Sequence, residues 1–185
     1  MNICLVGLGI PSLILANILA KKNIKISIFD EGKTKNKFTN RTIGITKNNV
    51  DYLENEKIII GKNAWEINNI KIFNELQSQK ELLNFGPTND KLFSVIKNSD
   101  LINLLGKIVK KNKLIKIIKS KKLSFYNSII KNQNKYDLVI NFNKNNIISK
   151  EIFYKRESRN YDSFAFTCLM KHKKCNNQTA YQIFT

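Results

Sequence analysis

The sequence has few of the residues on which most catalytic sites depend. Among its 185 residues there is one histidine, His172, and it stands among lysines in the segment KHKKC. A lone histidine in such a run is most simply a solvated loop residue, and it provides no Ser-His-Asp or Cys-His catalytic set. We therefore assign no proton-transfer catalyst, and the catalytic residues stay unknown.

Cysteines are also few, and their positions argue against metal and disulfide sites. Cys4, Cys168 and Cys175 show no paired spacing suited to zinc, and three is an awkward number for a disulfide framework. Cys4 stands within the apolar run at residues 3–6, where we expect it in the protein core. We predict no metal site.

Long hydrophobic runs are missing as well. The first apolar stretch is interrupted by polar residues and followed by KKN, so it falls short of the about 20 apolar residues that a membrane-spanning helix needs. It has no basic leader of the kind that opens a signal peptide, and it contains glycines. We therefore expect a cytoplasmic protein, and peripheral contact with the inner face of the membrane stays open.

Acidic residues are scarce: 14 Asp and Glu stand against 32 Lys and Arg, and the formal net charge is +18. Such a charge ordinarily suggests nucleic acid or an acidic membrane surface as a partner. The lysines, however, are interleaved with isoleucine and asparagine and form no recognisable nucleic-acid module. A coding bias towards Lys, Asn and Ile explains this pattern equally well, so nucleic acid is disfavoured. The densest run, residues 107–122, leaves contact with anionic lipid or polyphosphate open.

The first thirty residues contain a dinucleotide-binding pattern. Residues 3–6 form a short apolar run typical of a buried parallel strand, and the sequence GLGIPS follows. Residues 12–23 carry an apolar stripe that ends in lysines, as expected for a crossover helix. A second run, IKISIFD, ends in Asp30. This order of strand, glycine turn, helix, strand and acid is the one that a dinucleotide-binding βαβ unit requires.

The residues of the glycine turn each have a predicted task. Gly7 supplies the tight turn, and Gly9 allows a pyrophosphate to approach the backbone. Pro11 stands near the first helical turn, where a missing N–H costs least, and Ser12 stands where a third glycine is usual. Asp30 lies close to the roughly 20-residue offset at which a carboxylate reaches the ribose hydroxyls. The alternative is an ordinary turn, with Asp30 as a strand-end cap.

Beyond this unit the pattern is less regular. Residues 101–112 form an amphipathic helical pattern that Asp100 opens as an N-cap, and residues 135–142 read as another buried strand. From Arg159 onward the sequence alternates like a pair of sheet strands connected by KKCNNQ. Strands and helices alternate early and strands dominate late, which predicts an α/β fold with a second sheet.

With these pieces in order, the sequence resembles the N-terminal part of the FAD-dependent aromatic hydroxylases (class A flavoprotein monooxygenases), particularly their ubiquinone-biosynthesis branch. GLGIPS with Asp30 is similar to the family's FAD adenosine site. NRTIGITKNNVDYLENEKI is similar to its arginine-containing segment, which would place Arg41 near the phosphate and ribityl region of the flavin. FSVIKNSDLINLL is similar to a further family segment and points to Asn98 and Leu101. YDLVIN, NYDSFAFTCLM and AYQIFT are similar to its third dinucleotide-domain strand and the start of its substrate-domain sheet.

The resemblance implies a Rossmann-like FAD/NAD(P)-binding domain at residues 1–158, with a substrate-domain excursion near residues 62–96. Residues 159–185 would begin a truncated, mainly β substrate domain. The implied function is FAD-dependent hydroxylation of an aromatic ring, such as that of a ubiquinone precursor. The implied FAD-binding residues are Gly7, Gly9, Ser12, Asp30 and Arg41.

Two departures from the family's pattern leave alternatives open. After DLVI the family usually has GADG, where this sequence has Asn141, Phe142, Asn143 and Lys144. Asn143 cannot replace the charge of a carboxylate, and Lys144 puts a side chain where glycine allows close approach. The sequence also stops before the family's G-D segment. The alternatives are a degenerate, non-catalytic remnant and one half of a split enzyme that a second polypeptide completes.

Overall fold

The computed structural model of the chain forms two compact units, and each is described by itself. The first unit holds Met1–Lys37 and Ile102–Phe166, and the second holds Phe38–Leu101 and Thr167–Thr185. The predicted domain bounds stay a prediction. The residues that the structure describes are 1–30, 32, 41–74, 80–87, 90–119, 126, 135–152, 155, 157, 159–164, 166, 168–170, 173 and 177–184.

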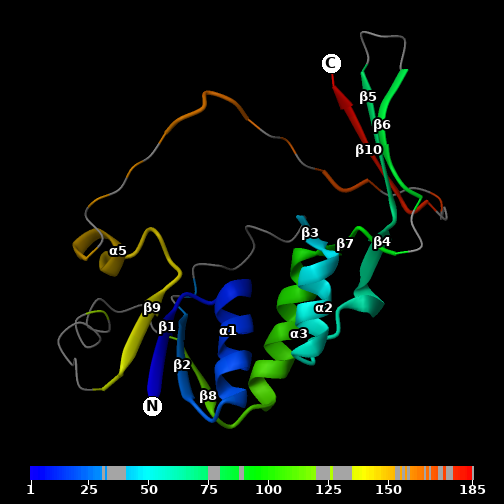
Figure 1. Cartoon of the computed structure of the whole chain (residues 1–185). Coiled ribbons are helices and arrows are strands. Elements are labelled where there is room, and N and C mark those ends of the chain that lie inside the picture. Colours follow the sequence, from blue (N-terminus) through cyan, green and yellow to red (C-terminus); the bar gives the residue numbers. More distant parts are fainter. Residues whose placement is uncertain are drawn as a thin grey trace. The chain divides into compact units, whose positions relative to one another are not determined.

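A four-stranded parallel sheet forms the centre of the first unit (Figure 1). Its strand order is β8-β2-β1-β9, and every pairing in it is parallel. Because the strands run the same way, their carboxyl ends meet at one edge of the sheet. The strands are β1 (Asn2–Val6), β2 (Lys25–Asp30), β8 (Ile115–Lys119) and β9 (Leu138–Asn141).

The apolar run of β1 is buried, as its sequence predicts for a central parallel strand. Helix α1 (Ile10–Lys21) connects β1 to β2 and contacts both strands, burying Leu13, Ala16 and Ala20. Cys4 and Val6 lie two residues apart, so they share one face of β1. They join a buried cluster whose other members are Phe29, Tyr126 and Ile148. The prediction that Cys4 belongs to the core is confirmed.

Two local predictions in this part of the chain are wrong. The strand expected as buried, β9, leaves Leu138 and Val139 44% and 37% exposed, because the described part of the sheet pairs it on one side alone. Helix α3 (Asn98–Lys111) begins at Asn98 and not at Asp100. Asp100 instead lies in the first turn of α3, where a negative charge complements the helix dipole.

The second unit contains two three-stranded sheets. Strands β3 (Thr42–Thr46), β7 (Phe93–Lys97) and β4 (Ala64–Ile67) pair antiparallel in the order β3-β7-β4. Helix α2 (Lys47–Asn55) contacts β3 and β7, and the 3-10 turn η1 (Gly61–Asn63) leads into β4. The buried side chains of this unit include Ile45, Val50, Leu53, Ile58, Ile60, Ile67, Ile96 and Leu101.

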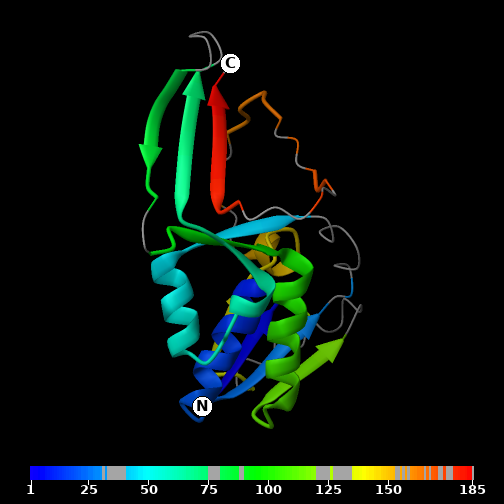
Figure 2. The ribbon, with the colours of Figure 1, turned by 90° about the vertical axis from the view of Figure 1, so that its right-hand side faces the viewer.

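The other sheet of the second unit corrects the prediction for the C-terminal residues. The pair of strands expected after Arg159 does not form, since residues 159–164, 166 and 168–170 contain no strand. Instead β10 (Thr179–Phe184) pairs parallel with β5 (Asn69–Asn74), and β5 pairs antiparallel with β6 (Lys80–Phe85). Figure 2 shows these three strands side by side. No helix in the described residues is long and apolar enough to cross a membrane.

Candidate functional site

The turn between β1 and α1 requires glycine at its first position. Gly7 has φ +105°, a conformation that L side chains rarely adopt, and its N–H donates to the carbonyl oxygen of Phe29 at 2.9 Å. A Cβ atom added at Gly7 would lie 3.5 Å from the Cβ of Phe142, in ordinary contact. The requirement for glycine therefore comes from the backbone conformation rather than from crowding.

Gly9 is different, because the fold itself does not require glycine there. Gly9 is the N-cap of α1, with φ −136° and ψ 176°, which is extended backbone open to any residue. A Cβ atom added at Gly9 would meet Pro11 Cδ alone, at 3.8 Å. The space in front of this backbone is therefore open in the described structure. Such a space is what a ligand needs in order to approach the backbone closely.

Ser12 holds this turn together. Its hydroxyl is fully buried, accepts a hydrogen bond from the Gly9 N–H at 3.0 Å and donates one to the Gly9 carbonyl oxygen at 2.9 Å. The arrangement resembles half of a capping box, in which the N3 side chain satisfies the N–H of the N-cap residue. Ser12 thus supports Gly9 from inside the protein. A direct contact between Ser12 and a cofactor stays a prediction.

The first turn of α1 presents backbone donors beside Gly9. The first N–H groups of an α-helix have no acceptor within the helix, and Pro11 at the start of α1 has no N–H. Ser12 is fully buried, so Ile10, which is partly exposed, supplies the accessible donor of this turn, together with the positive end of the helix dipole. Donors of this kind favour a phosphate or another anion at the carboxyl edge of the sheet.

Asp30 ends β2 at the same edge of the sheet. Phe29 pairs with Val6 in register, so Asp30 stands opposite the start of the glycine turn. Asp30 is 8% exposed, and its Oδ1 accepts a hydrogen bond from the Gly32 N–H at 2.9 Å. This hydrogen bond is the one expected if Asp30 only caps the end of its strand, which is the alternative to a role in ligand binding. It occupies one carboxylate oxygen, and a carboxylate has further acceptor capacity for a ribose hydroxyl.

A network of asparagines, which sequence reasoning did not identify, forms the neighbouring turn from β9 to α5 (Ile147–Glu151). Asn141 and Asn146 exchange two side-chain hydrogen bonds of 3.0 and 2.8 Å. Asn146 Oδ1 also accepts from the Ser149 N–H at 2.8 Å, and Asn141 Nδ2 donates to Ser149 Oγ at 2.8 Å. The sequence signal was Asn146 directly before two apolar residues, because asparagine is preferred at a helix N-cap.

This network changes what the edge of the sheet offers to a ligand. Phe142 and Asn143 lie against Gly7, and the Phe142 N–H donates to the Val6 carbonyl oxygen at 2.8 Å. The side-chain amides of Asn141 and Asn146 form hydrogen bonds with each other and with Ser149, so this turn caps the N-terminus of α5. Among the described residues, the candidate site at this edge therefore consists of the β1–α1 turn and Asp30.

The remaining predicted residue, Arg41, belongs to the second unit. It is exposed and precedes β3, and its carbonyl oxygen accepts a hydrogen bond from the Asn98 N–H at 2.8 Å. The two segments that carry the resemblance around Arg41 and Asn98 thus meet within this unit, and Leu101 is buried in it. Contact between Arg41 and a cofactor stays a prediction.

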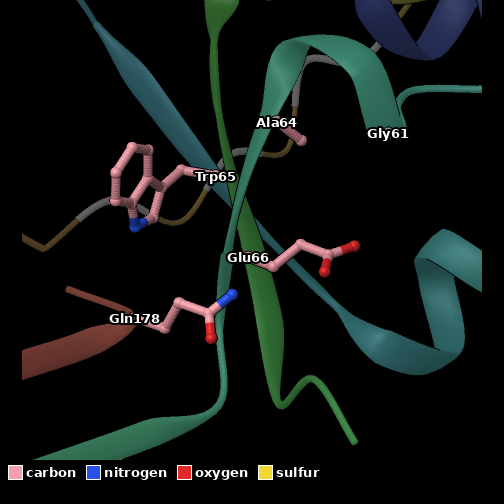
Figure 3. Close-up of a pocket in the computed structure, with 5 residues that line it drawn as sticks. All are labelled: Gly61, Ala64, Trp65, Glu66 and Gln178. Atoms are coloured by element: carbon pink, nitrogen blue, oxygen red, sulfur yellow. The ribbon is translucent and has the colours of Figure 1, made fainter. Parts of the chain in front are cut away.

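The second unit also has a cavity of about 620 Å³, lined by Gly61, Ala64, Trp65, Glu66 and Gln178. Figure 3 shows Trp65 and Glu66 on opposite sides of β4. The Trp65 Nε1–H donates to the Asn177 carbonyl oxygen at 2.9 Å, and Glu66 forms a 3.3 Å ion pair with Lys91. The polar ends of these two side chains are therefore engaged within the protein.

Titratable side chains of the described residues give no further site. Burial raises the pKa of the Cys4 thiol to about 12, against a smaller lowering effect of the Lys135 charge. Cys4 is therefore an unreactive core residue. Among the described residues, no group of three His, Cys, Asp or Glu side chains is placed to hold a metal ion. His172 and Cys175 lie outside the described residues.

Comparison with known proteins shows similarity at the level of the fold. A scan against protein-family models finds no match, and a search of the curated proteins finds none either. Among solved structures, p-nitrophenol 4-monooxygenase PnpA from Pseudomonas putida DLL-E4 matches 63% of this chain and 31% of its own, with TM-score 0.54 and 13% identity. PqsL of P. aeruginosa, in complex with 2-aminobenzoylacetate, matches 64% of this chain and 33% of its own, with TM-score 0.55 and 10% identity.

A third structure holds a cofactor. CtdE, in complex with FAD and a substrate, matches 63% of this chain and 30% of its own, with TM-score 0.50 and 19% identity. The chain thus spans about a third of the length of these structures. The likeness confirms the predicted α/β class: this is a mixed α/β fold with a parallel sheet, similar to monooxygenase structures.

Proposed function

We propose that the chain binds FAD through the turn between β1 and α1. The observation that carries this proposal is the contrast between two glycines. Gly7 is needed for its positive φ, whereas Gly9 has extended backbone and, among the described residues, an added Cβ atom there would meet Pro11 Cδ alone. A glycine that the fold does not require, placed beside the free donors of a helix N-terminus, suits a backbone that a pyrophosphate approaches closely.

The sheet supports the same proposal. Its order β8-β2-β1-β9 corresponds to the 3-2-1-4 order of a Rossmann fold, in which the dinucleotide lies beyond the carboxyl ends of the strands. Asp30 would accept from the ribose hydroxyls, and its charge would repel a 2′-phosphate. Arg41 would pair with phosphate through its fork of N–H donors. Ser12 would position Gly9 from beneath.

The activity that we propose is that of a monooxygenase on an aromatic ring. PnpA is a monooxygenase, and CtdE was solved with FAD and a substrate. When bound, reduced flavin supplies the activation of dioxygen for hydroxylation of an electron-rich ring. The described residues would hold and orient the adenosine and pyrophosphate half of the cofactor. A ubiquinone precursor is the substrate that the sequence resemblance suggests.

A second candidate is one half of a larger enzyme that another polypeptide completes. The open sheet β10-β5-β6 favours it. On β6, Leu83 and Phe85 stand opposite Ile72 and Ile70 of β5. Leu83 and Phe85 are each at least half exposed. Side chains of β10 are also exposed, including Tyr181 and Ile183. Exposed apolar surface of this kind is typical of an interaction site.

The third candidate is a non-catalytic remnant of a flavin enzyme. The asparagine network favours it, because the β9–α5 turn uses its polar groups to cap a helix and presents no carboxylate. Binding of FAD without turnover is the behaviour that this candidate predicts.

Absorption spectroscopy and an FAD titration test the proposal. We expect the purified chain to be yellow, or to bind added FAD saturably with quenching of the flavin fluorescence. Gly9→Val should abolish this binding, because its side chain fills the space of the pyrophosphate. Gly106→Ala is the matched control, since a Cβ atom there meets nothing within 4 Å. A colourless chain that is indifferent to FAD would remove the proposal.

A further inference from the structure

Lysines gather at the amino end of the parallel sheet in the first unit. The α1–β2 and α3–β8 turns lie together there, and the Ile26 N–H donates to the Leu114 carbonyl oxygen at 2.8 Å. Figures 1 and 2 show both turns at the end of the sheet where the N-terminus lies. The residues before β9 reach the same end, since the Asp137 N–H donates to the Asn2 carbonyl oxygen at 2.9 Å. We name the exposed lysines of this end the lysine end: Lys21, Lys22, Lys25, Lys110, Lys111, Lys113 and Lys135.

The charge of this end is unbalanced. Asp137 is the one acidic residue that the described part of the first unit places there, and its Oδ2 accepts from the Asn2 N–H at 2.6 Å. Among the described residues, the opposite, carboxyl end has Lys119, Lys144 and Lys150 together with Asp30 and Glu151.

Helix dipoles explain only part of the lysine end. Lys21 and Lys22 close α1, and Lys110 and Lys111 close α3, where positive charge is favourable. Lys25, Lys113 and Lys135 stand at or before the first residues of strands, where no helix dipole favours them. Their presence adds positive charge to an end that the helix termini already make positive.

We propose that the lysine end is a docking surface for an anionic lipid bilayer. Lysines that lie together near an anionic bilayer attract it additively, and a set of four to eight is typical of such surfaces. The side chain of Met1, 67% exposed, lies at the same end, where the Lys25 N–H donates to the Met1 carbonyl oxygen at 3.2 Å. An exposed apolar side chain among lysines suits the boundary between headgroups and acyl chains.

The composition of the lysine end favours lipid over nucleic acid. It has no arginine, and arginine is the residue whose guanidinium forms bidentate hydrogen bonds with nucleic-acid phosphates and bases. It also has no exposed aromatic ring on which a base would stack. Tyr136, next to Lys135, packs against the buried cluster of Cys4, Val6 and Phe29 instead.

Docking through this surface leaves the opposite edge of the sheet accessible. The glycine turn and Asp30 lie at the carboxyl ends of the strands, and the lysine end lies at their amino ends. A ligand that enters at the glycine turn therefore does not compete with the bilayer. The docking surface does not depend on the proposed cofactor, and its test is made without FAD.

Sedimentation of the whole chain with vesicles tests this proposal. We expect binding to vesicles of equal parts phosphatidylglycerol and phosphatidylcholine, weakening with added salt, and no binding to phosphatidylcholine alone. The variant with Lys22→Gln, Lys25→Gln, Lys111→Gln and Lys113→Gln should bind on the order of a hundredfold more weakly. The control carries Lys80→Gln, Lys97→Gln, Lys150→Gln and Lys155→Gln, which remove the same charge elsewhere, and should bind within about threefold of the wild type.

Equal losses in the two variants would overturn the proposal, because they would mean attraction by overall charge. Binding to a DNA duplex but not to anionic vesicles at the same salt would overturn it as well. Acetylation of lysines on the vesicle-bound wild type, read by mass spectrometry, gives a test that needs no variant. Lys22, Lys25, Lys111 and Lys113 should be protected, whereas Lys80 and Lys97 should not. Protection of all lysines alike, or of none, would contradict a specific docking surface.

Discussion

The hydroxyl of Ser12 and the backbone of Gly9 satisfy each other through two hydrogen bonds, one accepted at 3.0 Å and one donated at 2.9 Å. The two bonds fix the entry of the chain into α1 from the buried side. They leave the other side of Gly9 open, where an added Cβ atom would meet Pro11 alone. Ser12, which stands where a third glycine is usual, thus supports Gly9, the residue that a ligand would approach.

Ser12→Ala should lower the free energy of unfolding by about 1–2 kcal/mol, because the part-buried Gly9 N–H loses its acceptor. Chemical denaturation measures the change. Ser163→Ala, at an exposed position, is the control and should change stability by no more than about 0.5 kcal/mol. Equal stability of the two variants would mean that the Ser12 hydroxyl does not hold the turn.

Alanine at Gly7 and at Gly9 should separate the conformational role of glycine from its role in binding. Gly7→Ala should cost about 1–3 kcal/mol of stability, because alanine is strained at φ +105°. Gly9→Ala should change stability by no more than about 0.5 kcal/mol, since the backbone is extended and a Cβ atom there would meet only Pro11 among the described residues. Thermal melts of both variants measure the two stability changes. A larger loss for Gly9→Ala than for Gly7→Ala would show that the turn does not need glycine at position 7 for its conformation.

The first βαβ unit was predictable from sequence because its signals are local. The apolar run of β1, the glycine turn and the apolar stripe of α1 each lie within a few residues of the element that they specify. Helix α3 was expected too, but it begins at Asn98, two residues before the predicted cap. Acidic residues are favourable in the first turn of a helix as well as at its N-cap, so the position of Asp100 does not determine the residue at which α3 begins.

Long-range pairing and local side-chain networks were not predictable in the same way. Residues after Arg159 alternate like a hairpin, yet β10 pairs with β5, 110 residues earlier. Alternation specifies a strand but not its partner. Asn141 belongs to a segment that departs from a family pattern, but its side-chain hydrogen bonds with Asn146 required the structure.

Asp30→Ala should weaken FAD binding by about 1–3 kcal/mol, the scale of a hydrogen bond to a charged group. Isothermal titration of both proteins measures the difference. Asp162→Ala, at an exposed position in the described residues, is the matched control and should leave the affinity unchanged. If Asp30→Ala also leaves it unchanged, the ribose is held elsewhere and Asp30 is the strand-end cap alone.

Gly106→Ala should raise the free energy of unfolding by about 0.5–1 kcal/mol. Gly106 lies in the interior of α3, and a Cβ atom added there meets nothing within 4 Å. Alanine therefore restricts the unfolded chain and favours the helix without crowding. Urea denaturation with an unchanged slope should show the gain, and a loss of stability would indicate that α3 packs more tightly at this point.

Cys4 should resist alkylation in the folded protein at pH 8, whereas the exposed Cys168 should react. Burial raises the pKa of the Cys4 thiol from 9.0 to about 12, so the thiolate is scarce at that pH. The folded state keeps this proton between pH 9.0 and about 12, so the stability that the neutral thiol contributes is lost as the pH rises through that window. Mass spectrometry of iodoacetamide-treated peptides checks the labelling, and rapid modification of Cys4 would contradict its burial.

The affinity of the wild type and of Gly9→Val for FAD, measured side by side by equilibrium dialysis, decides whether the β1–α1 turn binds the cofactor. Circular dichroism establishes that both are folded. We expect saturable binding by the wild type and none by a folded Gly9→Val. Equal binding by the two proteins would contradict the assignment of the β1–α1 turn, and absence of binding by the wild type would contradict the cofactor.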